Sequence, residues 1–473
     1  MSIKILDAPE PSPGPLGRTE LYTLGMGQVI GAGIITLIGY GIAYTGNSAV
    51  LAIVVAVILG LIYNLPLTLC SSAFRMGGGY PALSANLLNP VITGVTSLVG
   101  LVGLTTLATF GTSFGIYLNQ LFPAISIKLG AVICFVFIYA VNMLGIKSMA
   151  KAGKYMGYIL IVMLLAFVVV GLTTKMVSWD ALNPGSQGFF MNGSSGFIGA
   201  VALFMYMSYG YNLVINFGVT SKDAKKDTPW TMVACGLSLI LVYGGIALVN
   251  TGVMPITEAM GMPLSVAAKI VLPGVFYILF MFGGPLCAIL TTLNSTFASV
   301  PPGMDMTVKD GWLPKWLVKK NRFGAQYIVL TMLFVIGIIP VLFGLEITTL
   351  TNMAMLISFV TMLIPFYCLL IMPKKCPTAW KAAKWHLPNW LYYIIWALSF
   401  AINLVFFGYF PLMNLPLPVI ITVAVLFVVI GAYAIARSRK ANAVVYKRLW
   451  SGLKHDEIDD LIANQGSRVS SSQ

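Results

Sequence analysis

The stretch that decides the fold reads Gly27-Gln28-Val29-Ile30-Gly31-Ala32-Gly33-Ile34-Ile35, and it lies inside an apolar run over residues 21–46. Glycine inside a helix lowers its stability by ~1 kcal/mol relative to alanine, and an unsatisfied amide in lipid is more costly still. These glycines therefore indicate one of two structures. One is close packing of a second helix, as Gly27-x-x-x-Gly31 would allow. The other is a broken helix whose free N–H groups bind an anion.

The composition places this run in a membrane. The 473 residues are 58% hydrophobic and 9% charged, so charged side chains are too few to cover a soluble protein of this length. A helix that crosses a bilayer needs ~20 mostly apolar residues, and long apolar runs do not suit an outer-membrane barrel. We predict an all-α polytopic membrane protein with twelve transmembrane helices. Their predicted bounds are 21–46, 48–72, 91–122, 126–146, 153–175, 196–220, 229–254, 268–304, 324–344, 346–372, 388–412 and 415–436.

The basic residues predict the orientation. With twelve spans both termini lie on one side, which then carries every lysine and arginine except Lys128, Lys175 and Lys269. Because basic loops stay in the cytoplasm, we expect both termini there, in the plasma membrane of a prokaryotic cell. Topology thus accounts for the positive charge, and no nucleic-acid partner is expected. The lipid bilayer is the partner expected from this pattern.

A second candidate break, Tyr206-Met207-Ser208-Tyr209-Gly210, lies in the sixth span. It begins about as far into that span as residues 31–33 do into the first span. The pair predicts two five-helix repeats with discontinuous first and sixth helices. Since each repeat has an odd number of helices, the second is inverted relative to the first. The predicted parts are an N-terminal cytoplasmic segment (1–20), repeat 1 (21–175), repeat 2 (196–372), helices 11 and 12 (388–436) and a C-terminal cytoplasmic tail (437–473).

Four motifs carry a resemblance to a known family. Residues 27–35 resemble the G-x-x-I-G-S/A-G-I-I/F signature of amino acid–polyamine–organocation (APC) superfamily permeases, and residues 76–81 resemble their P-x-x-G-G-x-Y. Residues 221–229 resemble the K-N-P-x-R-x-I-P loop, and residues 292–294 with 309–314 resemble A-T-L-N…R-D-G-x-L-P. The resemblance covers about residues 20–375 and implies the leucine-transporter fold.

The resemblance also implies where the substrate binds. Amides after Gly31 would hold a carboxylate, and carbonyls at the two breaks would hold an ammonium group. The implied substrate-binding residues are Ile30, Ala32, Gly33, Ile34, Tyr206, Met207 and Gly210. The sequence departs from the family pattern at Val219 and Thr220, where two acids are usual, and at Pro301-Pro302, where a serine–arginine pair is usual.

A coupling ion is a further expectation, and no other cofactor is expected. Carbonyl and hydroxyl oxygens suit a small hard cation. The predicted sodium ligands are Gly27, Ile30, Thr292, Ser295 and Thr296. Alternatively, such hydroxyls bond to the carbonyl four residues back in their own helix. Sodium-independent relatives place a lysine in the fifth helix, at a position that would fall near Leu160. Residues 155–174 of this chain contain no lysine, which favours sodium.

No acidic residue lies inside a predicted span. The nearest ones, Asp305 and Glu346, lie at span edges. Buried carboxylates carry protons and bind extra substrate cations, so their absence favours a neutral zwitterion. The leading prediction is a secondary active transporter of small neutral amino acids or related compounds. The alternatives are a sodium-independent exchanger and a non-transporting amino acid sensor. We predict no enzymatic activity, because the spans offer no nucleophile, metal ligands or paired acids of a recognisable site.

The cysteines and the C-terminal tail give two smaller expectations. The six cysteines are scattered and lie mostly in apolar runs, which predicts buried thiols and no disulfide framework or metal site. Val444–Leu453 alternates apolar residues with Lys447 and Arg448, which predicts an interfacial helix or, equally well, a solvated tail. The sequence leaves the oligomeric state open, with a monomer as the simplest expectation.

Overall fold

The computed structural model describes residues 4–88, 90–99, 101–208, 210–440, 444–454 and 457–461, nearly all of them helical. Elements of the first half are β1 (Lys4–Leu6), α1 (Arg18–Val29), α2 (Ala32–Thr45), η1 (Gly46–Ser48), α3 (Ala49–Ala73), β2 (Arg75–Met76), α4 (Tyr80–Leu87), α5 (Pro90–Val99), η2 (Val102–Thr106), α6 (Leu107–Leu121), α7 (Ile127–Met143), α8 (Ile146–Thr173), η3 (Asp180–Leu182), α9 (Gly193–Ser208) and η4 (Gly210–Phe217).

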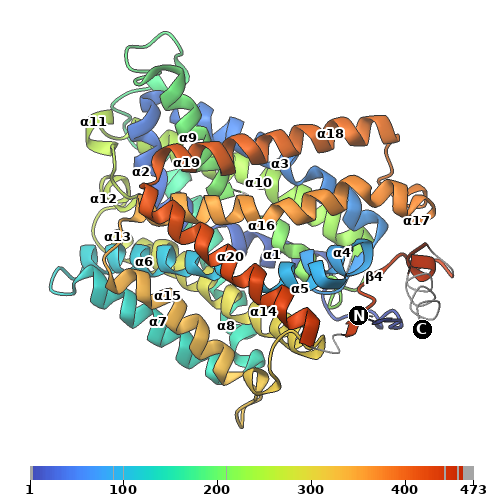
Figure 1. Ribbon diagram of the computed structural model, residues 1–473. Coiled ribbons are helices and arrows are strands. Elements are labelled where there is room, and N and C mark those ends of the chain that lie inside the picture. Colours follow the sequence, from blue (N-terminus) through green and yellow to red (C-terminus); the bar gives the residue numbers. More distant parts are fainter. Residues whose placement is uncertain are drawn as a thin grey trace.

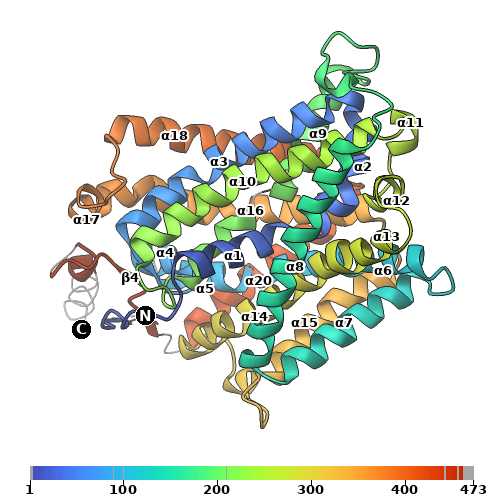
Figure 2. The same cartoon turned by 180° about the vertical axis from the view of Figure 1, so that it is seen from behind.

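Elements of the second half are α10 (Ala224–Gly252), α11 (Ile256–Ala259), α12 (Ser265–Val271), α13 (Val275–Met281), η5 (Phe282–Leu286), α14 (Cys287–Lys309), η6 (Lys315–Val318), α15 (Tyr327–Leu342), α16 (Ile347–Lys375), α17 (Pro377–Lys381), α18 (Asn389–Ile402), η7 (Asn403–Tyr409), α19 (Phe410–Asn414), α20 (Leu417–Lys440), β3 (Val444–Tyr446) and β4 (Leu449–Trp450). Elements η5 and η7 are π-helical turns, and the other η elements are 3₁₀ turns. The helices run between two ends of the molecule (Figure 1). We name the end with β4, α4 and α17 the terminal end, and the end with α11 and α12 the distal end (Figures 1 and 2).

Long apolar helices make this a multi-pass membrane protein. In the described part of the chain, eight helical stretches are long and apolar enough to cross a membrane. The first, Gly33–Ala73, contains both α2 and α3, and α7 and α15 are shorter apolar helices. The expected helical membrane protein is confirmed, while the count of twelve spans stays a prediction.

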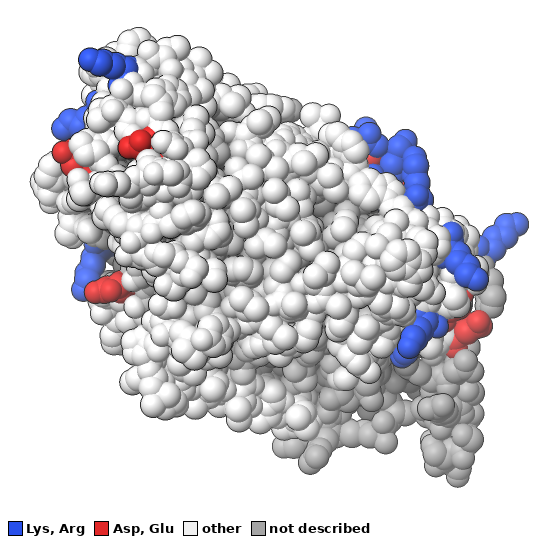
Figure 3. Space-filling view, turned by 90° about the horizontal axis from the view of Figure 1, so that it is seen from above, with Lys and Arg blue, Asp and Glu red and all other residues white. Residues whose placement is uncertain are grey.

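The molecular surface agrees with a lipid environment. Charged residues gather at the two ends, and a wide uncharged surface separates them (Figure 3). Large apolar side chains are exposed on the surface, including Leu241 of α10 at 78% and Phe343, in the turn after α15, at 80%. Such a continuous apolar surface is unfavourable in water and suits contact with lipid chains. The six cysteines are buried and free, as expected.

The helices pack in two groups. One group contains α2, α3, α9 and α10, and the other contains α6, α7, α8, α14 and α15. Helix α1 lies between them and contacts both α10 and α14. Its N-terminus begins after Gly17, whose amide donates a 3.0 Å hydrogen bond to the Glu20 carboxylate, a capping contact that favours helix initiation at this point. This packing places the interrupted first span at the centre of the molecule.

Two sequence predictions were wrong in detail. The predicted eighth span, 268–304, is interrupted, because α12 ends at Val271 and α13 begins only at Val275, after Gly274 with a φ of +61°. The predicted interfacial helix over Val444–Leu453 contains β3 and β4, which pair with β1 and β2. Valine, tyrosine and tryptophan favour a strand where a partner strand is available, and neither partner is close in sequence.

Candidate functional site

The first helix break lies between α1 and α2. Ile30 leaves the helical region with ψ of 89°, Gly31 is extended, and helical structure resumes at Ala32. The extended backbone of Gly31 does not itself require glycine. A β-carbon at Gly31 would, however, lie 2.6 Å from the Thr292 hydroxyl oxygen and 3.3 Å from the Phe110 ring. Glycine is therefore needed here because α14 and α6 approach the break closely.

The second break faces the first. Helix α9 ends at Ser208 and η4 begins at Gly210, and Tyr209 between them lies outside the described residues. A β-carbon at Gly33 would lie 3.0 Å from the β- and γ-carbons of Met207. A β-carbon at Gly210 would lie 3.4 Å from the carbonyl oxygen of Gln28. The chain thus brings together two interruptions that are more than 170 residues apart in sequence.

The predicted substrate residues surround this meeting point. Ile30 belongs to the first break, and Ala32, Gly33 and Ile34 form the first turn of α2. The amides of a first helical turn have no partner within the helix, and Gly31 has no side chain with which to cap them. From the second break, Met207 is buried, and Tyr206 and Gly210 are half-buried. The arrangement combines helix amides with carbonyls at helix ends, which suits a group that carries both charges.

Tyr243 was not predicted from the sequence, and it contacts both breaks. Its side chain is fully buried in α10, and its hydroxyl lies 3.1 Å from the Val29 carbonyl and 3.5 Å from the Met207 carbonyl. A phenol has one proton, so it donates to one of these carbonyls at a time. A tyrosine in an apolar helix gives no sequence signal for this role, because its contacts come from two distant segments.

The predicted sodium ligands are brought together only in part. The Thr292 hydroxyl lies 3.3 Å from the Gly27 carbonyl and 3.5 Å from the Ile30 carbonyl, and it also lies 3.1 Å from the Ala288 carbonyl of its own helix. These neutral oxygens are the type of donor that a hard cation accepts. The Thr296 hydroxyl instead donates to the Thr292 carbonyl one turn back, at 3.0 Å. Ser295 is half-buried in α14.

The position expected for a lysine holds an apolar side chain. Leu160 in α8 is 1% exposed. Nearby, a β-carbon at Gly157 would lie 3.7 Å from the Thr23 methyl group, which shows that α8 packs directly on α1. No cluster of three or more histidine, cysteine, aspartate or glutamate side chains occurs among the described residues. The oxygens described beside the first break, the carbonyls of Gly27 and Ile30 and the Thr292 hydroxyl, are neutral.

A cavity of about 200 Å³ lies elsewhere, between α3, η4 and α10. Its lining is mostly apolar, with Asn64, Thr68 and Tyr211 as polar members. The predicted substrate residues do not line it. The two breaks are closely packed in this conformation, as the contact between Gly33 and Met207 shows.

Comparison with known proteins gives consistent matches over this region. The amino acid permease family matches residues 16–433, which include both breaks, α10 and α14. An uncharacterized protein of Methanocaldococcus jannaschii is 24% identical over 375 residues, covering 75% of this chain and 82% of that protein. The branched-chain amino acid permease BcaP of Bacillus subtilis is 23% identical over 397 residues, covering 78% of this chain and 83% of BcaP.

Proposed function

Because this chain belongs to the amino acid permease family, we propose that it is a secondary active transporter that moves small neutral amino acids by alternating access. The family match and the permease relative confirm an APC superfamily amino acid permease, a transporter and not an enzyme. The finer proposal concerns the substrate, the binding residues and the mechanism. It includes branched-chain amino acids, since BcaP carries that name.

One observation carries the proposal: the uncapped start of α2 faces the end of α9 at the centre of the bundle. The amides of Ala32, Gly33 and Ile34 would donate to a carboxylate, aided by the positive end of the α2 dipole. The carbonyls at the ends of α1 and α9 would accept from the ammonium group. No substrate charge would then need a buried counter-ion, which fits spans without acidic residues.

The packing supports an inverted repeat with two moving groups. The first two predicted spans of each repeat pack together, as α2 and α3 do with α9 and α10. Of the other predicted spans of the two repeats, α6, α7, α8, α14 and α15 pack together as the second group, while α16 contacts α4, η2 and α6. Alternating access in such folds is a rocking of one group against the other around a central site. Tyr243 would tie the ends of α1 and α9 during this motion.

Transport can be tested with purified protein in proteoliposomes. We expect counterflow of labelled leucine, valine or alanine, and much slower counterflow of lysine or glutamate, because the site offers no charged partner for their side chains. Binding that stabilises the protein thermally without any counterflow would contradict transport and favour the sensor. Counterflow of lysine as fast as that of leucine would contradict the neutral substrate class.

We propose sodium as the coupling ion, held near the Gly27 and Ile30 carbonyls and the Thr292 hydroxyl. Their shared position beside the first break supports this, as does Leu160 in place of a lysine. We expect leucine affinity to rise with sodium concentration by reciprocal linkage. The test compares leucine uptake, and thermal stability without leucine, in sodium chloride and in choline chloride. Equal values in both salts would favour the sodium-independent exchanger.

We also propose that both termini face the cytoplasm of a prokaryotic cell. The concentration of basic residues on that predicted side supports this. Cysteines introduced beside Lys128 and Lys175 should react with an impermeant reagent added to intact cells, and cysteines beside Lys319 and Lys381 should not. The opposite labelling pattern would reverse the orientation. The oligomeric state is tested by light scattering in detergent, for which we expect a monomer.

A further inference from the structure

A short segment of the C-terminal tail is buried although the tail is polar. Lys447 is 8% exposed, Arg448 5%, Leu449 0%, Trp450 8% and Ser451 3%. Two buried cations are unfavourable unless each has a partner. We name residues 444–451 the latch, and its partners come from several elements at the terminal end.

Backbone pairing seats the latch on the loop after α3. Strand β4 pairs antiparallel with β2, so Leu449 lies opposite Met76 and Trp450 lies opposite Arg75. Next to this pair, the Gly77 amide donates a 2.7 Å hydrogen bond to the Arg448 carbonyl. The Arg448 amide in turn donates to the Asn86 side chain of α4, at 2.9 Å. The latch is therefore bonded to two elements through its main chain alone.

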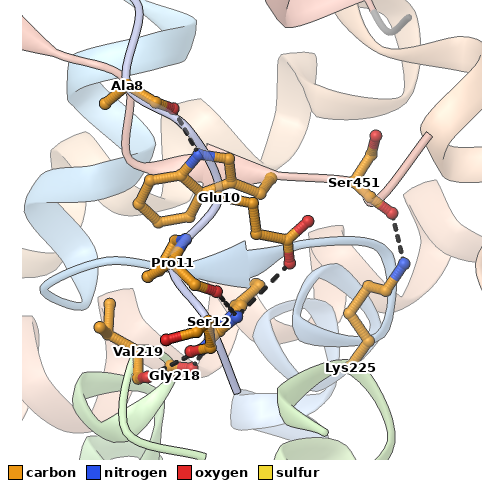
Figure 4. Close-up of polar contacts among 10 residues, drawn as sticks. Ala8, Glu10, Pro11, Ser12, Gly218, Val219, Lys225 and Ser451 are labelled. Atoms are coloured by element: carbon orange, nitrogen blue, oxygen red, sulfur yellow. Dashed lines mark hydrogen bonds and ion pairs between the residues drawn. The ribbon is translucent and has the colours of Figure 1, made fainter. Parts of the chain in front are cut away.

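Charged contacts extend the latch to α14 and α10. The Arg448 guanidinium pairs with Asp310, which follows α14 directly and is fully buried. Burial raises the pKa of the Asp310 carboxyl to about 6, and Arg448 offsets only part of this cost. Lys225, in the first turn of α10, donates to the Ser451 carbonyl (Figure 4). Helices from both packing groups are thus held by one short segment.

Residues of the N-terminal segment also contact the latch. The Trp450 indole N–H donates to the Ala8 carbonyl at 2.9 Å (Figure 4). Strand β3 pairs with β1. The buried Arg75 guanidinium connects this segment to the chain after η4. Its acceptors are the carbonyls of Pro11, Ser12, Gly218 and Val219, and it forms an ion pair with Glu10 (Figure 4).

We propose that residues 444–451 keep the terminal end closed and must detach from β2, α4, Asp310 and Lys225 before that end can open. The inference rests on the alternating access proposed above. If the two helix groups separate at each end in turn, a segment bonded to α14 and α4 as well as α10 cannot keep all of these bonds. Release of the latch would then be a step of every transport cycle.

A reversible cross-link tests this step. The six native cysteines are replaced by alanine, and Met76→Cys is combined with Leu449→Cys, two positions that face each other across the β2–β4 pair. Oxidation to the disulfide, monitored as the loss of both free thiols, should reduce leucine counterflow by at least ~10-fold. Dithiothreitol should restore the counterflow. Each single cysteine variant is the control and should not respond to oxidant. Fully cross-linked protein that transports as fast as the dithiothreitol-treated protein would overturn the proposal.

A second measurement needs no substrate. In protein that lacks the native cysteines, Gly157→Cys places a single thiol on α8 of the second group, where a β-carbon would lie 3.7 Å from the Thr23 methyl group of α1. Arg448→Met and Trp450→Leu should each speed labelling of this thiol by ~10-fold as the open population rises. The control Lys454→Ala removes an exposed cation just beyond the latch and should leave labelling unchanged.

The two measurements separate the possible failures. Unchanged labelling of the thiol introduced by Gly157→Cys in monodisperse Arg448→Met and Trp450→Leu proteins would overturn the latch. Absence of leucine counterflow from the intact chain would count against the proposed function, and the labelling result would still decide whether the latch controls opening.

Discussion

The two helix breaks lie face to face but are stabilised differently. At the break between α1 and α2, hydroxyls from other helices contact carbonyls at the end of α1. Tyr243 of α10 contacts the Val29 carbonyl, and Thr292 of α14 contacts the Gly27 carbonyl. At the break between α9 and η4, the Ser208 hydroxyl bonds to carbonyls of its own helix, Phe204 at 2.9 Å and Met205 at 3.2 Å. The first break therefore receives hydroxyls from two other helices, whereas the second, among its described residues, combines the Ser208 contacts within α9 with a longer contact, 3.5 Å, between the Tyr243 hydroxyl and the Met207 carbonyl.

This difference ranks the effects of substitutions. A change that separates the two breaks should have the largest effect on transport. Removal of a hydroxyl supplied by another helix should come next, because it leaves a carbonyl unsatisfied at a cost of ~1–3 kcal/mol. Removal of a hydroxyl that only bonds within its own helix should have the smallest effect.

Gly33→Val should have the largest effect. A β-carbon here meets Met207 at 3.0 Å, and valine adds two further methyl groups to that contact. Because the interior is closely packed, we expect leucine counterflow to fall at least ~100-fold. Gly244→Val in α10 is the matched control, since its β-carbon would meet no atom within 4 Å. Near-normal affinity in Gly33→Val protein that inserts correctly would place the site elsewhere.

Tyr243→Phe should come second. It removes the hydroxyl that contacts the Val29 and Met207 carbonyls and keeps the ring. We expect a fall in counterflow rate of about 10-fold and a stability loss of ~1–3 kcal/mol. Tyr392→Phe is the control, because Tyr392 is also buried and donates to the single Leu369 carbonyl at 2.8 Å. A loss of transport equal in both variants would show that Tyr243 acts only through stability.

Thr292→Val should have a smaller, ion-dependent effect. The substitution keeps the shape but removes the hydroxyl beside the Gly27 and Ile30 carbonyls. We expect leucine affinity to fall a few-fold, by about 1 kcal/mol, and its dependence on sodium to weaken. The control is Thr291→Val one residue earlier, whose hydroxyl donates at 2.6 Å to the Cys287 carbonyl of the same helix. An identical sodium response in both variants would contradict the proposed ion site.

Ser208→Ala should have the smallest effect. Its hydroxyl bonds only to the Phe204 and Met205 carbonyls, which already belong to the last turn of α9. We expect less than a twofold change in leucine counterflow, within the range of ~0.5 kcal/mol typical of neutral substitutions. A larger loss than that of Tyr243→Phe would invert the comparison and show that the second break is the more sensitive one.

The sequence by itself determined the class of the protein and indicated two places where helices are interrupted, at residues 31–33 and 206–210. Long apolar runs are a property of local composition, and glycines inside such a run mark a place where the helix can break or where another helix can approach closely. The motifs around these residues also pointed to the permease family, which the family match confirms. Each of these features depends on a short stretch of residues and can be read along the chain.

Tertiary structure alone decided which side chains meet at the breaks and how the tail is used. Tyr243 is one tyrosine among 21, and only packing brings its hydroxyl to carbonyls of α1 and α9. Likewise, Val444–Trp450 forms strands because β1 and β2 offer partners from the other end of the chain and from the loop after α3. Hydrogen-bond partners distant in sequence leave no periodic pattern, so burial of Arg448 against Asp310 follows from the fold and not from local composition.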